Sequence, residues 1–176
     1  ARQKNILYYQ AHHDALTGLP NRVLSMKELK LGLDEATKQK KELVLMFLDL
    51  DRFKRINDSL GHDVGDKVIH IIGERLKRSM RKEDMIARLG GDEFLVMMKG
   101  VDHHEDILAE ARRILRIVDE PISIENHTMY TSASIGISRY PVDAVSADDL
   151  LKYADTAMYK AKEEGGNNFQ FYRSEM

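Results

Sequence analysis

The sequence contains no cysteine among its 176 residues. A disulfide-bonded scaffold and a zinc site with cysteine ligands are therefore excluded. A chain without cysteine fits a reducing compartment but does not require one.

A strong charge of one sign is also missing, because the formal net charge at pH 7 is −2. No overall basic field points to a nucleic acid duplex as a partner. A nucleotide needs only a local site, so the charge balance does not argue against one.

Long apolar runs are absent as well. The longest is Leu43–Leu48, six residues, whereas a membrane-spanning helix needs about 20. No signal peptide is visible, and the sequence opens with Ala1 rather than Met. We therefore expect a cytoplasmic segment of a longer protein, with no membrane contact of its own. Any membrane anchor or sensor would lie outside this segment.

Hydrophobic residues make up 43% of the chain and charged residues 32%, as in a globular domain with one sizeable core. Elements of both kinds alternate along the chain, which predicts a mixed α and β domain. We expect helices over 1–13, 21–40, 52–57, 64–79, 104–119 and 147–163. We expect strands over 43–50, 85–89, 94–98, 122–124, 128–140 and 169–172.

Two acidic residues end the predicted strand 43–50, in the order Asp49-Leu50-Asp51. Unpaired buried charge is costly, so a buried strand ending in acids needs an explanation. One explanation is structural, with Asp51 capping the next helix and Asp49 pairing with a lysine. The other is a functional site, because rigid strand ends position reactive groups well.

A tight turn places two more acids between apolar strands, in Gly90-Gly91-Asp92-Glu93-Phe94. Paired glycines at this position predict a hairpin. Regular alternation would send Asp92 and Glu93 to opposite faces, so that one of them could join Asp49. The resulting oxygen-rich pocket suits Mg²⁺, which binds through one or two carboxylates and substrate phosphates.

Two rival metal sites do not fit. A calcium-binding EF-hand that began at Asp49 would have Lys54 in place of glycine and Leu60 in place of the bidentate glutamate. His12-His13-Asp14 and His62-Asp63 contain the His-Asp pair of HD phosphohydrolases. The further helical ligands that such enzymes need are missing from the sequence.

The turn motif is the signature that names the GGDEF family, and the chain resembles this family in further ordered blocks. These blocks are Asp14–Arg22 (DALTGLPNR), Asp49–Asp58 (DLDRFKRIND), Gly61–Asp66 (GHDVGD) and Ala154–Lys162 (ADTAMYKAK). The resemblance covers nearly all of residues 14–172. It divides the chain into the end of an upstream helical linker, 1–13, and a GGDEF domain, 14–176.

The resemblance implies an α+β fold with a central, mostly antiparallel sheet flanked by helices, similar to the palm of nucleotidyl cyclases and polymerases. It implies a bacterial diguanylate cyclase, which condenses two GTP molecules into the second messenger cyclic di-GMP and releases two pyrophosphates. It further implies two Mg²⁺ or Mn²⁺ ions per active site, and a homodimer in which each subunit presents one GTP.

The family's site residues carry over to matching positions only. The metal ligands would be Asp49, the backbone carbonyl of Leu50, and Asp92. Asp92 would also be the base for the 3′-hydroxyl, with Glu93 assisting, and Lys54 would stabilise the transition-state charge. The substrate-binding residues would be Asn57, His62, Asp66, Arg52, Phe53 and Lys162.

Simple chemistry supports part of this assignment. A carboxylate such as Asp66 can accept both N–H donors on the edge of guanine, and adenine lacks that pair. The amide of Asn57 can donate and accept. The structural alternatives are a helix C-cap at Asn57 and an N-terminal helix charge at Asp66. Backbone N–H groups at Arg52 and Phe53 would open a short helix and could bind phosphate.

Arg81-Lys82-Glu83-Asp84 matches the family's RxxD pattern at the expected distance before the signature. In the family this motif is an allosteric site at which the product inhibits the enzyme. The arginine fork suits a guanine edge or a phosphate. Arg81 and Asp84 are therefore the expected inhibitory site, with Arg112 or Arg113 as candidate additions from a neighbouring helix.

One position departs from the family. The family commonly has Gly-Arg-Asn where this chain has Gly165-Gly166-Asn167, so a phosphate-binding arginine is missing and GTP affinity or turnover would fall. Residues 168–172 resemble chains in which an EAL phosphodiesterase domain follows. The alternative function is therefore a catalytically weak module that binds GTP or cyclic di-GMP and regulates an attached EAL domain.

Overall fold

The structure is a computed structural model that describes residues 2–176. Its helices are α1 Arg2–His12, α2 Arg22–Gln39, α3 Phe53–Leu60, α4 His62–Ser79, α5 His104–Asp119 and α6 Ala147–Glu163. Its strands are β1 Glu42–Leu50, β2 Met85–Gly90, β3 Glu93–Val101, β4 Ile122–Ile124, β5 His127–Met129, β6 Ala133–Tyr140 and β7 Asn168–Phe171.

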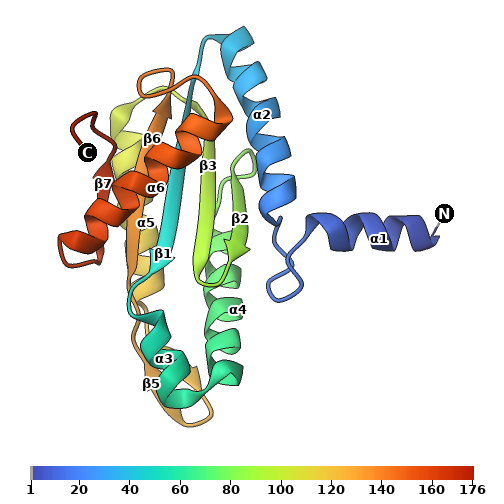
Figure 1. Cartoon of the computed structure of the whole chain (residues 1–176), viewed down its shortest axis with the longest axis vertical. Helices are drawn as coiled ribbons and strands as arrows, with labels where there is room; N and C mark the ends of the chain where they lie inside the picture. The colour runs from blue at the N-terminus through green and yellow to red at the C-terminus, as the bar shows by residue number, and fades with distance from the viewer. Residues whose placement is uncertain (1) are drawn as a thin grey trace.

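The central sheet has the strand order β2-β3-β1-β6-β7 (Figure 1). Its neighbours are antiparallel except for β6 and β7, which are parallel. The chain thus has the α+β fold with a mostly antiparallel sheet that the sequence predicted.

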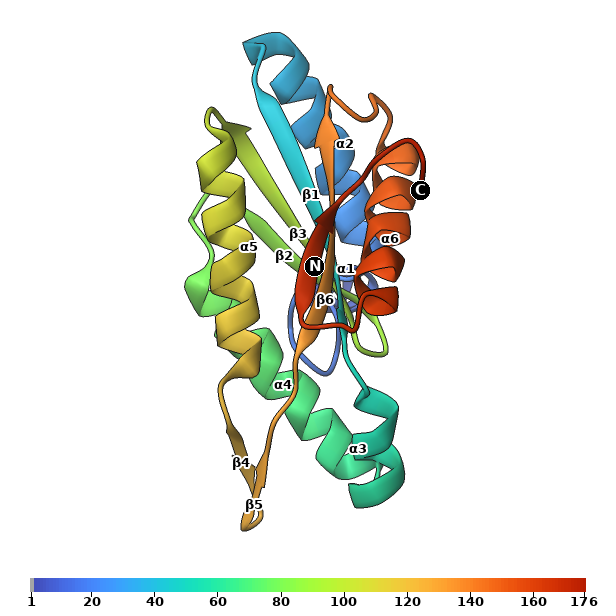
Figure 2. The same ribbon diagram turned by 90° about the vertical axis from the view of Figure 1, so that its left-hand side faces the viewer.

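Helices cover both faces of the sheet, with α4 and α5 on one side and α2 and α6 on the other (Figure 2). The apolar run of strand β1 is unbroken because both faces of the strand are buried. Val44, Met46 and Leu48 belong to the core beneath α4 and α5. Leu43, Leu45 and Phe47 alternate with them and pack in the core that contains side chains of α2 and α6. A strand buried on both faces has no solvent side to carry polar residues.

Helix α1 has no buried residue and extends away from the sheet (Figure 1). It confirms the helix predicted over 1–13, although residue 1 lies outside the described part of the chain. Across residues 2–176, no helix combines the length and the apolar character needed to cross a bilayer.

The strand predicted over 128–140 is interrupted. Strand β5 pairs only with β4, in a separate two-stranded ribbon, and β6 begins at Ala133 in the main sheet. Between them the Ser132 carbonyl accepts a hydrogen bond from the Asp51 amide at 2.8 Å. The interruption therefore brings residues 130–132 beside the end of β1.

Candidate active site

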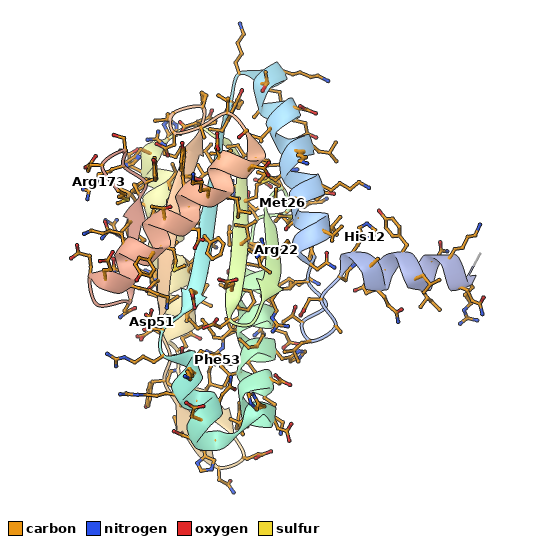
Figure 3. The ribbon with its side chains drawn as sticks, viewed as in Figure 1. His12, Arg22, Met26, Asp51, Phe53 and Arg173 are labelled. Carbon is orange, nitrogen blue, oxygen red and sulfur yellow. The ribbon has the colours of Figure 1, made fainter. Side chains whose placement is uncertain are left out.

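The acidic residues gather where β1 ends against the β2–β3 turn. The Leu50 amide donates to the Asp92 carbonyl at 3.3 Å. In the β1–β3 register Asp49 lies opposite Glu93. Figure 3 shows Asp51 at this lower end of β1, with Phe53 just beyond it in α3.

The register changes the expected arrangement of the two signature acids. Directly opposed residues of an antiparallel pair share a face, so Asp49 and Glu93 point to the same side of the sheet. Asp92 precedes β3 and belongs to the turn, so the regular alternation that we assumed does not apply to it. Both signature acids can therefore stand near Asp49.

Electrostatics mark Asp49 as the most perturbed of these acids. Burial, followed by the neighbouring Asp92 carboxyl, raises the pKa of Asp49 to about 8, while Lys162 opposes the shift. Burial, then Asp155 and Asp92, also raise the pKa of Glu93, against the influence of Arg22. Crowded, desolvated carboxyls of this kind are characteristic of functional sites.

Asp51 lies in a different environment. Burial works against its charge, yet hydrogen bonds from Ser132 Oγ and Ser134 Oγ, each 2.6 Å, and from the Asn167 amide at 2.8 Å lower its pKa. Its structural role is therefore to join β1 to β6 and to the turn before β7. It does not cap α3, whose N-cap residue is Arg52.

Lys162 of α6 connects the acids. Its Nζ lies 3.5 Å from Asp49 Oδ1 and 3.5 Å from Asp51 Oδ1. The lysine partner suggested for Asp49 on structural grounds is thus present. The same lysine is the residue expected to bind phosphate, and the structure places its charge beside the Asp49 and Asp51 carboxylates.

The donors present fit a hard divalent cation. No three His, Cys, Asp or Glu side chains within residues 2–176 form a ready-made metal cluster. Asp49, Asp92 and the backbone carbonyl of Leu50 would instead supply two carboxylates and one carbonyl. This incomplete oxygen set suits Mg²⁺, which keeps water and substrate phosphate among its ligands.

The residues expected to bind the base come from α3 and α4, beyond the end of β1. The carboxamide of Asn57 lies over Gly65, where an added Cβ would sit 1.8 Å from Asn57 Oδ1. Gly65 precedes Asp66, so the Asn57 side chain lies against the first turns of α4, where Asp66 is also found. The sequence analysis missed Gly65, whose signal is a glycine within a helical pattern.

Asn57 is not the C-cap residue of α3, which is Gly61. Asp66 and His62 are exposed. Asp66 also lines a pocket of about 460 Å³ with Leu16 and His70, and the lining of that pocket includes neither Asn57 nor His62. The structure therefore places Asn57 against Gly65, the residue before Asp66, but shows no direct contact between the Asn57 and Asp66 side chains, and it leaves His62 exposed.

The start of α3 holds the residues expected to bind the outer phosphates. Arg52 adopts a left-handed conformation, with φ 57°, and is the N-cap residue between β1 and α3. Arg52 and Lys54 are exposed, whereas Phe53 is half-buried against the core under α4. Both cations are thus available to an anion at this helix start.

The RxxD pair, the expected inhibitory site, lies away from the signature acids. Arg81 donates from Nε and Nη2 to the two oxygens of Asp84, each at 2.8 Å, and also from Nη2 to the Lys99 carbonyl at 3.2 Å. The Asp84 side chain has no solvent exposure. This fork holds Arg81 at one end of the β2–β3 hairpin, while the signature turn lies at the other end.

Arg81 opens onto a pocket of about 430 Å³ beside α5. Arg113 and Arg116 line this pocket, and Arg112, the other candidate, does not. Glu110 also lines it and forms an ion pair with Arg113. Sequence reasoning missed Glu110 and Arg116, because only helical spacing on α5 relates them to Arg113.

Comparison with known proteins agrees with this geometry. Residues 11–168 match the family described as "Diguanylate cyclase, GGDEF domain". The chain is 43% identical to diguanylate cyclase TpbB of Pseudomonas aeruginosa (strain UCBPP-PA14) over 159 residues, which cover 90% of the chain and 37% of the relative. It is 41% identical to cyclic di-GMP phosphodiesterase NbdA of P. aeruginosa over 171 residues, covering 97% of the chain and 22% of the relative.

Solved structures show the same likeness. The GGDEF domain of TpbB from P. aeruginosa is 40% identical, with a TM-score of 0.89 over 92% of this chain and 95% of that one. The coiled coil and GGDEF domain of DgcB from Caulobacter crescentus, solved with c-di-GMP, is 25% identical, with a TM-score of 0.88 over 97% and 90%.

The chain spans between about a fifth and two fifths of the length of these curated relatives. The family match covers most of the chain, and the acids of the signature turn lie together at the end of the sheet. The chain therefore belongs to the GGDEF domain family of diguanylate cyclases.

Proposed function

We propose that this chain is a catalytic domain that condenses two GTP molecules into cyclic di-GMP and two pyrophosphates. The observation that carries the proposal is the contact between the Asp49 and Asp92 carboxyls at the end of β1, with the Lys162 ammonium 3.5 Å from Asp49. Phosphoryl transfer depends mainly on positioning and on charge stabilisation, and these residues supply both.

In the proposed reaction Asp92 accepts the proton of the 3′-hydroxyl of one GTP. The freed oxygen attacks the α-phosphorus of the other GTP, and pyrophosphate leaves as the α–β bridging bond breaks. The 3′-hydroxyl of the second GTP then attacks the α-phosphorus of the first in the same way. This step releases the second pyrophosphate and closes the ring. Glu93 assists beside Asp92, and Lys54 and Lys162 neutralise charge on the phosphates.

Asp49, the Leu50 carbonyl and Asp92 would hold Mg²⁺ or Mn²⁺, two ions per site. When bound, such ions stabilise the attacking and leaving oxygens. Arg52 and Phe53 would bind the outer phosphates through the start of α3. Asn57 and Asp66, with His62 nearby, would select guanine by its edge.

The proposed active form is a homodimer, because each domain presents one GTP and the product has two-fold symmetry. The whole protein would carry a sensor before residue 14 and, after residue 176, an EAL domain. This domain would lie in the cytoplasm, where GTP is available, and a membrane anchor of the whole protein would lie outside this segment.

Arg81 and Asp84 are proposed to form the site at which cyclic di-GMP acts as a feedback inhibitor, with Arg81 as the exposed contact and the buried Asp84 holding it in place. The arginines of the neighbouring pocket, Arg113 and Arg116, would meet its phosphates. Binding there would act on the signature turn through the β2–β3 hairpin.

A second candidate is a regulatory module that binds nucleotide without turning it over. Gly166 replaces the family's arginine, and one relative of similar identity is named a cyclic di-GMP phosphodiesterase. The retained acids Asp49, Asp92 and Glu93 favour the cyclase.

The decisive experiment incubates the concentrated protein with GTP and Mg²⁺ and follows cyclic di-GMP by chromatography. Asp92→Ala should abolish product, whereas Asp34→Ala, an exposed acid of α2, should leave the yield unchanged. Absence of product from the parent, together with GTP binding that Asp66→Ala removes, would support the regulatory module instead.

A further inference from the structure

Arg88 of β2 contacts two segments that the proposed reaction does not otherwise connect. Its Nε and Nη2 donate to the Gly91 carbonyl at 3.1 and 2.8 Å. Its Nη1 donates to Asp14 Oδ1 at 2.8 Å. The Arg88 and Asp14 side chains are only 14% and 16% exposed. Charge-assisted hydrogen bonds shielded from water in this way hold their geometry firmly.

The Gly91 carbonyl belongs to the peptide unit that leads into Asp92. Gly91 has φ +49°, and the next carbonyl, that of Asp92, accepts the Leu50 amide. Two donors of one planar guanidinium on the Gly91 oxygen fix the orientation of this peptide. The direction in which the Asp92 side chain leaves the turn is therefore set on one side by Arg88 and on the other by Leu50.

Asp14 holds the other end of the contact. Its second oxygen, Oδ2, accepts the Thr17 amide and hydroxyl, each at 2.8 Å. The Asp14 amide donates to the Leu19 carbonyl at 2.7 Å, and the Arg88 amide donates to the Pro20 carbonyl at 3.0 Å. The loop that follows α1 is thus folded on itself and tied to β2.

The position of this loop depends on α1. Asp14 follows the last residue of α1, His12, by two positions, and α1 has no buried residue that would anchor it to the domain (Figures 1 and 3). The Ala11 and His12 carbonyls at the end of α1 accept hydrogen bonds from Asn21, so a displacement of α1 would reach both the start of α2 and the nearby Asp14. The contact from Asp14 through Arg88 to Gly91 is a direct route from that helix to the catalytic turn.

We infer that Arg88 is a positioning residue for Asp92, and that Asp14 couples the segment after α1 to the signature turn. The inference rests on the proposed cyclase activity, since it assigns Asp92 as the group to be positioned. A displacement of about 1 Å at a reacting group can cost on the order of a hundredfold in rate.

The test uses Arg88→Lys, Asp14→Asn and the double variant. A lysine carries one ammonium and can reach Gly91 or Asp14 but not hold both in one plane. The carboxamide in Asp14→Asn replaces one of the two oxygens by an NH2 group, so either the position that faces Thr17 or the position that faces Arg88 presents a donor to a donor. Arg139→Lys is the matched control, because Arg139 pairs with Glu42 at 2.7 Å, both 24% exposed, at the other end of β1.

We expect kcat to fall about tenfold or more in each single variant, while KM for GTP stays within about twofold. The double variant should be no slower than Arg88→Lys, because the two residues act as one unit. Arg139→Lys should keep the parent kcat. Hydrogen exchange at the amides of residues 91–93 should be faster in both single variants and unchanged in the control.

Equal kcat and equal exchange in Arg88→Lys and Arg139→Lys would overturn the inference. Multiplicative losses in the double variant would overturn the link to Asp14. The exchange measurement also separates the two proposals. If the parent makes no cyclic di-GMP but residues 91–93 loosen in both single variants, the cyclase proposal fails and the coupling stands.

Discussion

At the residue scale, two glycines leave room for side chains of the site. Gly65 makes space for the Asn57 carboxamide, and Gly166 lies against the Asp51 carboxylate. Each contact joins segments that are distant in sequence or belong to different elements. An alanine at either glycine would therefore disturb one contact, with Asn57 at position 65 and with Asp51 at position 166.

Gly65→Ala should raise KM for GTP by about tenfold, with a smaller effect on kcat. The new Cβ would lie 1.8 Å from Asn57 Oδ1 and 3.2 Å from Phe53 Cζ, so the carboxamide must move. Steady-state kinetics measure the effect. Gly73→Ala is the control in the same helix, because its closest contacts are with Thr17 and not with Asn57. Equal KM values in the two variants would remove Asn57 from guanine recognition.

Gly166→Ala should destabilise the fold more than Gly18→Ala. The two glycines have nearly the same φ, +75° and +73°, but only at Gly166 would a Cβ meet other atoms, at 2.7–2.9 Å from the Asp51 carboxylate. Backbone strain costs each variant about 1 kcal/mol, and the contact adds to it at Gly166. Urea unfolding measures both. Similar losses would mean that Asp51 moves aside without cost.

At the element scale, the β2–β3 hairpin connects the two candidate sites. The RxxD pair lies at its open end and the signature turn at its closed end. In the sheet, β2 is the edge strand and β3 pairs with β1, so the hairpin is a continuous hydrogen-bonded unit that reaches from one candidate site to the other. Arg88 lies within β2, between the two sites.

Arg81→Ala should relieve feedback inhibition and raise the final yield of cyclic di-GMP several-fold. The substitution removes both donors to Asp84 and the positive charge offered to the product. Progress curves with added cyclic di-GMP measure the inhibition. Arg78→Ala, an exposed arginine at the end of α4, should leave it intact. Unchanged inhibition in Arg81→Ala would exclude this site.

The prediction of elements was most successful where the local sequence carries a strong signal. The apolar run at 43–48 identified β1, and paired glycines identified the β2–β3 hairpin. The strand predicted over 128–140 was wrong in its continuity, because its β-forming residues do not show that Ser132 meets Asp51. A local pattern cannot reveal a partner 81 positions away.

At the scale of the whole molecule, the proposed reaction needs two copies of the chain. One domain presents one set of Asp49, Asp92 and Asp66, and cyclic di-GMP contains two equivalent nucleotides. The exposed helix α1 extends away from the sheet, so its surface is free of contacts with the core of the domain (Figure 1).

Dimerisation predicts that specific activity rises with protein concentration. Below the dimer dissociation constant, the rate should follow roughly the square of the chain concentration, because two chains meet for each turnover. Initial rates over a dilution series, beside sedimentation at the same concentrations, measure this. A rate linear in concentration where the protein sediments as a monomer would contradict the two-fold arrangement.

The sequence by itself determined the family, the order of the elements and the acids of the signature turn, because these depend on local spacing and on ordered motifs. Only the tertiary structure decided that Glu93 lies opposite Asp49, that Lys162 lies between Asp49 and Asp51, and that Arg88 joins Asp14 to Gly91. Register and side-chain contacts arise from packing between distant segments, and no single segment of the sequence encodes them.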